Sequence, residues 1–294
     1  MTPEPTTTDL LGEIITWDAQ SAEIDVQKIR QALTDTGLDT DYARALSTKS
    51  AFSRAAKHLK ENRTIDKVVE NAKAQEITFQ LTRKAVNDGV MQFDYETQIT
   101  LNTQSGDISC GIPEIEAQAQ ALFAHAMQVR TATDITRMVQ KMFKDRADLF
   151  PINPSKGIAY FVPDAHKGFT SKVKDFMDKV GGTLWLFPVP KGTDHGNASV
   201  RDAVSNGLEA LLAELNEAVE QWDDSTRNDT VKRKLEHWRA IKHKAESYAT
   251  YLEANQQAVL DKIADAKAAL VAKYTEIRPD SELANKPSPG PAIA

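Results

Sequence analysis

The feature that most constrains this chain is the segment from Val231 to Ile277, in which apolar side chains recur every three or four positions. This spacing lines them up along one side of a helix, and its persistence over several heptads is typical of a coiled coil. One continuous helix of that length would measure roughly 70 Å. The segment therefore predicts a long helix that must bury its apolar side against something.

A second helical pattern comes just before it. Val200–Trp222 also steps by three or four residues, and a polar turn at 223–229 separates the two patterns. Acidic side chains dominate 200–224, whereas basic side chains dominate 231–244. Opposite charges on neighbouring helices favour an antiparallel hairpin. We therefore expect a long C-terminal antiparallel helical hairpin, or coiled coil, as a separate extension over residues 197–278.

The second helix of this hairpin is longer than the first, so part of its apolar stripe lacks a cover within the hairpin. That part either packs back on the globular domain or meets another copy of the chain. An exposed stripe of that length is uncommon in a monomer. We therefore predict a homo-oligomer that assembles through the coiled coil, which another protein could also bind. The predicted oligomerisation residues are Leu252, Val259, Ile263 and Leu270.

Residues 11–192 predict an α+β globular domain, a mixed sheet with packed helices. Gly12–Asp18 has the β-branched and aromatic residues of a first strand. Asp25 is a good N-cap for a helix that stops at Gly37. A second helix is expected over 50–59, followed by a short helical piece at Ile65–Val69.

Alternating apolar and polar residues over 77–82 and 91–101 predict two antiparallel strands. The Asn-Asp-Gly sequence at 87–89 suits the tight turn between them. The apolar residues stay in one odd-numbered phase, from Ile77 to Leu101, so one solvent-facing side is expected. The meander should continue to Ile108 and Cys110. Pro113 then begins a helical region that continues past residue 140 as one helix or two.

The stretch 157–190 predicts a strand–helix–strand unit. Ile158–Val162 and Leu184–Val189 are short apolar runs, and an amphipathic helical pattern between them ends at Gly181-Gly182. In such a unit the two strands are parallel and the crossover is right-handed. A polar loop, Lys191–Asn197, leads from this unit to the predicted hairpin.

Composition narrows the class of protein. Of 294 residues, 41% are hydrophobic and 27% are charged, which is ordinary for a chain that buries a core. The net charge of −6 argues against binding nucleic acid over the whole surface. The single cysteine, Cys110, excludes an intrachain disulfide and a multi-cysteine metal site. With no signal peptide or membrane-spanning run, we expect a cytoplasmic protein without a membrane partner, and disordered tails at 1–10 and 279–294.

No catalytic motif stands out. The sequence contains no phosphate-binding loop, dinucleotide-binding fingerprint, His-Glu-x-x-His motif or nucleophile elbow. We therefore predict a non-enzymatic protein without cofactor, metal or catalytic residues, in which Cys110 is a structural thiol. The Asp194-His195 loop, at a predicted strand end, is where a ligand or an unrecognised active site at 188–197 would lie.

Two basic clusters, at 54–63 and 232–244, leave an alternative open, a nucleic-acid-binding accessory factor. Clustered Lys and Arg bind backbone phosphates. The competing explanations are a solvated helix face for the first cluster and pairing with the acidic helix for the second. The residues in question are Arg54, Lys57, Lys60, Arg63, Lys232, Arg233, Lys234 and Arg239.

Two runs carry a resemblance to a family. GIAYFVPDAHKGFTSKVKDFMDKVGGTLWLFPVP, at 157–190, has a Gly-x-x-Tyr-Phe-Val-Pro strand, a helix and a strand ending in Pro. ITWDAQSAEIDVQKIRQAL, at 15–33, places a Trp-bearing strand before a helix, and AFSRAAK follows at 51–57. Both are similar to an uncharacterised family of bacterial and phage proteins. The resemblance implies a bacterial or phage origin and an α/β core, and it assigns no activity. We therefore expect a self-associating scaffold or interaction protein.

Overall fold

The computed structural model describes residues 9–20, 23–87, 90–153, 157–223 and 225–277. The tails expected at 1–10 and 279–294 and the turn at 88–89 lie almost wholly outside these residues. The fold is α+β, as expected, and it divides into two compact units. Unit 1 holds the chain up to Trp17, Phe143–Ser171 and Leu184 onward. Unit 2 holds Asp18–Met142 and Lys172–Thr183. The border expected between 11–192 and 197–278 is not the border between these units, because the C-terminal helices share unit 1 with a sheet.

The sheet of unit 1 has four strands in the order β10-β1-β9-β8. β1 runs antiparallel to β9, with Gly12 opposite Pro163. The backbone N–H of Lys191 donates to the carbonyl of Asp9 at 2.9 Å, so the end of β10 lies beside the start of β1. β9 and β10 are therefore parallel to each other, as predicted for the strand–helix–strand unit at 157–190. They are not neighbours in the sheet, because β1 lies between them. The strands are β1 Leu10–Asp18, β8 Phe150–Pro151, β9 Tyr160–Pro163 and β10 Thr183–Pro190. The 3-10 turn η2, Asp164–His166, and helix α5, Lys167–Lys179, connect β9 to β10.

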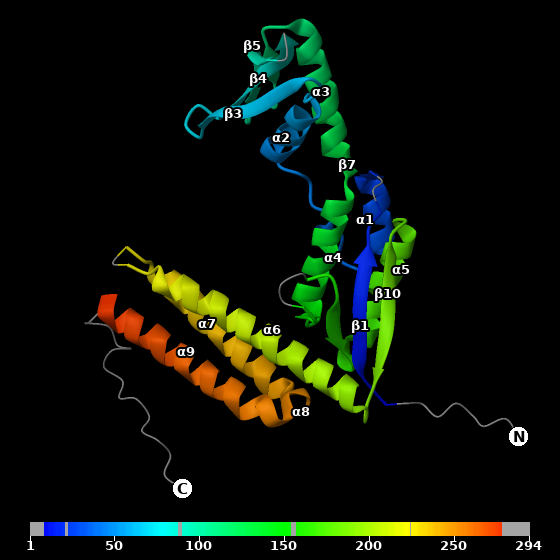
Figure 1. Cartoon of the computed structure of the whole chain (residues 1–294), viewed down its shortest axis with the longest axis vertical. Coiled ribbons are helices and arrows are strands. Elements are labelled where there is room, and N and C mark those ends of the chain that lie inside the picture. The colour runs from blue at the N-terminus through cyan, green and yellow to red at the C-terminus, as the bar shows by residue number, and fades with distance from the viewer. Residues whose placement is uncertain (1–8, 21–22, 88–89, 154–156, 224, 278–294) are drawn as a thin grey trace, which may run out of the picture. The chain divides into compact units, whose positions relative to one another are not determined.

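The C-terminal helices of unit 1 form a three-helix bundle, in which α9 contacts both α6 and α7 (Figure 1). The two-helix hairpin expected with one helix from Val231 to Ile277 is wrong, because the chain turns back after α7. The segments are α6 Asp194–Glu220, α7 Asn228–Ser247, α8 Ala249–Leu252, the 3-10 turn η3 Glu253–Asn255 and α9 Gln256–Ile277.

Tertiary contacts account for the break between α7 and α9, where the sequence carries neither Gly nor Pro. The Tyr251 hydroxyl donates to the carbonyl of Leu11 at 3.0 Å, and its ring packs edge-on against Phe161. The Tyr248 ring packs the same way against Phe150. These contacts bind the turn to the sheet, and Glu253 adopts a φ of 46°, which non-glycine residues seldom do. A heptad pattern does not report such contacts.

Unit 2 contains the antiparallel sheet β3-β4-β5-β6, covered on one face by α2 and α3. Pairing of Ile65 with Leu81 shows that 65–69 is a strand, not the short helix expected, because β-branched residues fit a pleated surface. The helical region after Pro113 consists of two helices, α3 and α4. The strands of this sheet are β3 Arg63–Asn71, β4 Glu76–Asn87, β5 Val90–Asn102 and β6 Ile108–Cys110. The covering helices are α2 Thr48–His58 and α3 Pro113–Gln128. The others are β2 Ile24–Asp25, α1 Val26–Asp35, η1 Thr40–Tyr42, β7 Val129–Arg130 and α4 Ala132–Arg146.

Candidate functional site

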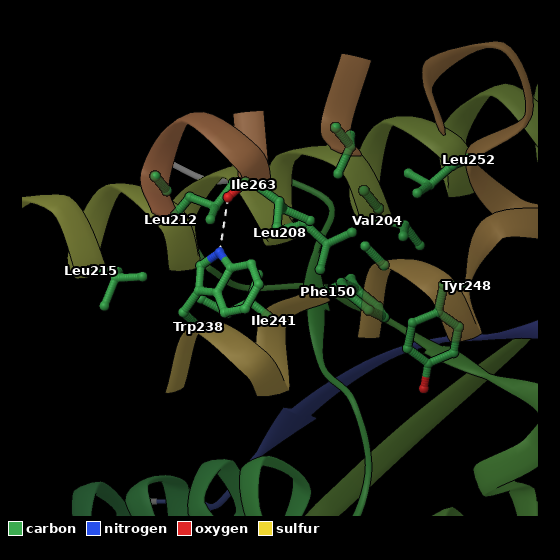
Figure 2. Close-up of a cluster of buried hydrophobic side chains, with 14 of the residues drawn as sticks. Phe150, Val204, Leu208, Leu212, Leu215, Trp238, Ile241, Tyr248, Leu252 and Ile263 are labelled. Atoms are coloured by element: carbon green, nitrogen blue, oxygen red, sulfur yellow. Dashed lines mark hydrogen bonds between the residues drawn. The ribbon is translucent and has the colours of Figure 1, made fainter. Parts of the chain in front are cut away.

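The four predicted oligomerisation residues lie inside the three-helix bundle. Leu252, Val259, Ile263 and Leu270 are 0%, 1%, 2% and 1% exposed. Their neighbours in the same buried cluster include Leu208 and Leu212 of α6 and Ile241 of α7, several of which Figure 2 shows. The expectation of an uncovered stripe on the last helix is therefore wrong, because α9 turns back and the chain covers the stripe itself.

Trp238 fixes the contact between α7 and α9. Its indole Nε1–H donates to the backbone carbonyl of Ile263 at 2.8 Å, the dashed line in Figure 2. The Lys267 ammonium lies 5.2 Å from the centre of the Trp238 ring, within the range of a cation–π contact. One side chain therefore combines apolar burial with a specific hydrogen bond, which sets the register of the two helices.

A network of polar side chains joins the C-terminal end of α7 to the rest of unit 1. Asp148 accepts a hydrogen bond from the Tyr248 hydroxyl, and its carboxylate forms an ion pair with the Lys244 ammonium. His166 Nε2 lies 3.1 Å from the same hydroxyl oxygen. Burial, together with the Asp148 carboxylate, raises the pKa of Tyr248 well above its ordinary value of 10. These groups satisfy one another, so the network holds the α7 end in place rather than presenting a free nucleophile.

A cavity of about 280 Å³ lies in unit 2 between α2 and α3. Several polar groups at its wall are paired, and His125 Nε2 lies 2.6 Å from Glu23 Oε2. Arg54 makes two hydrogen bonds, of 2.5 and 2.6 Å, to Asp134. Burial tends to raise the pKa of Asp134, but the bonds from Arg54 and Thr131 outweigh it and lower that pKa. The lining residues are Glu23, Arg54, His58, Leu122, His125, Ala126, Val129 and Thr131. Among the residues that the structure describes, no group of three or more His, Cys, Asp or Glu is arranged to hold a metal ion.

The two basic clusters differ in how much charge they leave free. In the first, Arg54 pairs with Asp134 and Arg63 with Glu96, whereas Lys57 and Lys60 are exposed. In the second, on α7, Lys232, Arg233 and Arg239 are exposed and Lys234 is partly buried. Within the described ranges, none of these four α7 residues lies within 4.0 Å of a carboxylate. The expected pairing of basic α7 with acidic α6 is therefore not seen there.

Acidic residues of the bundle pair elsewhere. Glu209 of α6 forms an ion pair with Lys262 of α9 at 2.8 Å, and Arg201 of α6 forms one with Glu253 at 3.2 Å. The Asp194-His195 segment is not a loop, because α6 begins at Asp194 and these residues form its first turn. Whether that turn binds a ligand stays a prediction. Cys110 is half-buried, with its sulfur 3.4 Å from the Thr97 hydroxyl, and its structural role stays a prediction.

The most exposed apolar residues of the meander lie on one strand edge. Met91, Phe93 and Tyr95 of β5 are 56%, 56% and 63% exposed. β6 pairs with β5 only over Ile99–Leu101, so β5 has an unpaired edge before that point among the described strands. β3 ends its pairing with β4 at Arg83. We call Arg83–Asn87 of β4 with Val90–Glu96 of β5 the arm, and the outer side of Val90–Glu96 the free edge.

A β-bulge explains why these residues are exposed. Leu81 pairs with Thr97, but the next residue, Thr82, pairs with Tyr95, so Glu96 is an extra residue in β5. Because side chains alternate, one extra residue moves everything beyond it to the other face. Leu81 and Thr97 face the core, whereas Thr82 and Tyr95 face away from it. The expectation that Met91, Phe93 and Tyr95 share a face with Ile99 and Leu101 is therefore wrong.

One signal in the sequence could have revealed this reversal. Continuing the phase of Ile77, Phe79 and Leu81 places Arg83 on the core side of β4, where a charge is unexpected. The structure resolves the conflict by placing Glu96 beside Arg83, with Nη2 2.9 Å from Oε1. The inner face of the arm therefore carries the charges of Arg83, Asp94 and Glu96. The outer face carries Met91, Phe93 and Tyr95, with exposed Lys84 directly beside Phe93.

These features define an α+β protein that buries the apolar stripe of its C-terminal helices and exposes Met91, Phe93 and Tyr95 on the arm. No helix in the described residues is both long and apolar enough to cross a membrane. The chain belongs to DUF6744, a family of unknown function, whose model matches residues 10–286. No curated protein and no solved structure matches the chain. Membership of an uncharacterised family, expected from the sequence, is thereby confirmed.

Proposed function

We propose that this protein is a non-enzymatic interaction protein that self-associates, and that the free edge of β5 makes the contact. The observation that carries this proposal is the exposure of Met91, Phe93 and Tyr95 on a strand that pairs with β4 on one edge and, over Val90–Glu96, with no described strand on the other. The assembly expected through Leu252, Val259, Ile263 and Leu270 loses its support, because those residues are buried within the chain. A cytoplasmic location and a bacterial or phage origin belong to the same proposal.

An unpaired strand edge favours the addition of another strand. Its free N–H and C=O groups can hydrogen-bond a partner, and alternate side chains then provide specificity. Proteins that avoid such pairing place Lys, Pro or a covering element on the edge. The edge strand β10 of unit 1 carries Pro188 and Pro190. The free edge of β5, Val90–Glu96, contains neither Lys nor Pro.

Sedimentation velocity on the full chain, over loading concentrations from about 1 to 100 µM, tests the proposal. The expected result is an oligomer whose fraction rises with concentration. Shortening the arm, by joining residue 83 to residue 94 through an Asn-Gly turn, should remove it. A monomer at every concentration would refute self-association.

A second candidate, nucleic-acid binding, is favoured by the α7 cluster alone. Lys232, Arg233 and Arg239 are exposed cations, and phosphate contacts of that kind give a binding constant that falls steeply with salt. Reversing Lys232, Arg233 and Lys234 to Glu should abolish binding to a labelled duplex. Reversing Lys57 and Lys60 is the matched control and should leave the salt slope unchanged. Binding that ignores both changes would contradict this candidate.

A further inference from the structure

We infer that the free edge of β5 pairs with the free edge of a second copy of this chain, antiparallel and centred on Phe93. The inference rests on the proposed function and names its partner and its register. A twofold axis through Phe93 would join two β3-β4-β5 sheets into one continuous sheet. Such a contact is isologous and closes after two copies.

The backbone groups of Phe93 point toward the free edge. The N–H of Lys84 donates to the carbonyl of Asn62 at 2.8 Å, so the backbone polar groups of Lys84 face β3, away from β5. Lys84 and Phe93 are direct partners in the β4–β5 ladder. In an antiparallel pair, such partners either bond each other or both point outward. The N–H and C=O of Phe93 therefore point to the edge at which no described strand pairs with β5. Because this direction alternates along a strand, the N–H and C=O of Met91 point the same way.

Side-chain pairing supports the Phe93 register. Opposite residues share a face, so a twofold axis perpendicular to the sheet pairs Phe93 with Phe93 and Met91 with Tyr95. The exposed apolar side chains of the two copies would then form one band on the outer face. On the other face, Asp94 lies opposite Gln92, so two carboxylates are not placed opposite each other. This register therefore pairs apolar side chains with one another and places no like charges directly opposite.

Neighbouring registers are worse. Centring on Asp94 places two Asp94 carboxylates opposite each other, and like charges in that position are destabilising. Centring on Tyr95 places Asp94 opposite Glu96, and it requires Val90 to pair with Thr100, which already pairs with Ser109 of β6. Centring on Gln92 instead places Tyr95 beyond Val90, the first residue of the partner's β5, so the Tyr95 ring has no residue of that strand opposite it.

Charge substitutions at the centre test this register directly. Phe93→Lys and Phe93→Glu each place like charges opposite each other, and each should weaken the dimer at least tenfold in sedimentation velocity. An equimolar mixture of the two variants should recover the dimer, because the introduced ammonium of one copy would meet the introduced carboxylate of the other. Val69→Glu is the matched control, an equally drastic change at a residue 42% exposed on the opposite edge strand, β3. It should leave the dimer intact.

Each outcome decides one part of the inference. If the unaltered chain is monomeric throughout, self-association itself fails. If it dimerises and the Phe93 variants dimerise equally well, the free edge is not the contact, although self-association stands. If both variants dissociate and their mixture does not recover, the contact is not centred on Phe93. Phe93→Thr, which keeps a strand-forming residue, should weaken the dimer less and guards against misfolding of the charged variants.

Discussion

Arg63 holds Glu96 with two hydrogen bonds, 2.5 Å from Nε to Oε2 and 2.9 Å from Nη2 to Oε1. Glu96 is the extra residue of the bulge in β5, and Arg63 lies directly opposite Arg83 in the β3–β4 ladder. Two like charges in that position would repel, and the carboxylate bonds both of them. The bulge therefore supplies the counter-ion for an Arg pair and, in the same step, turns the apolar residues of the arm outward.

Glu96→Gln should lower the free energy of unfolding by about 1–2 kcal/mol, because the Arg pair loses its counter-charge. The hydrogen bond from Arg63 is the largest cause that lowers the pKa of Glu96, to about 2 from 4.5. A folded-state pKa below the unfolded value stabilises the protein above about pH 4.5, and this contribution is lost as the pH falls toward 2.

Urea unfolding between about pH 5 and pH 2 measures both effects. The unaltered chain should lose more stability over this range than Glu96→Gln does. Glu76→Gln, an exposed change on the same sheet, is the control and should match the unaltered chain. Parallel pH profiles for all three proteins would contradict the role of Glu96.

Gly207→Ala should destabilise unit 1 by about 1–3 kcal/mol, although alanine normally stabilises a helix interior by about 1 kcal/mol relative to glycine. A Cβ at position 207 would stand 2.7 Å from Cδ1 of Phe150, closer than real Cβ contacts allow. In α5, a Cβ at Gly168 would meet nothing within 4 Å. Gly168→Ala is therefore the control and should leave stability unchanged or raised. Thermal unfolding compares the stability of the three proteins. Equal stability of the two variants would show that the Phe150 ring moves aside without cost.

Tyr248→Phe should cost about 1–2 kcal/mol at neutral pH, because Asp148 loses a buried hydrogen bond. Burial raises the pKa of the Tyr248 phenol, so its contribution is present below the ordinary value of 10 and is lost as the pH rises above it. The variant should therefore lose less stability than the unaltered chain between about pH 9 and pH 11. Denaturant unfolding of the variant and of the unaltered chain at these pH values is the measurement. Identical alkaline profiles would refute the assignment.

Trp238→Phe should lower the free energy of unfolding by about 1–3 kcal/mol, since the carbonyl of Ile263 loses its indole donor inside the bundle. Trp185→Phe is the matched control, because Trp185 is 45% exposed, and it should change stability by less than about 0.5 kcal/mol. Circular dichroism in urea reports both. Equal losses would mean that the Trp238 hydrogen bond adds nothing to the packing.

The sequence predicted elements well where local chemistry decides them. Asp25 caps α1 by accepting a hydrogen bond from Gln27 at 2.7 Å, and Pro113 occupies the first turn of α3, both as expected. The apolar stripe of the C-terminal region is buried as the heptad spacing implies. What covers that stripe was predicted wrongly, because the turn at Glu253 depends on Tyr248 and Tyr251 contacting residues more than 80 positions away.

By itself, the sequence determined where most helices and strands begin and which side of the C-terminal helices must be buried, because side-chain periodicity and capping act over a few neighbouring residues. Only the tertiary structure decided which surfaces remain open. The reversal of α9 covers Val259 and Ile263, and one inserted residue, Glu96, exposes Phe93 and Tyr95. Both outcomes depend on contacts between distant segments, and a single shift in register changes the face of every residue beyond it.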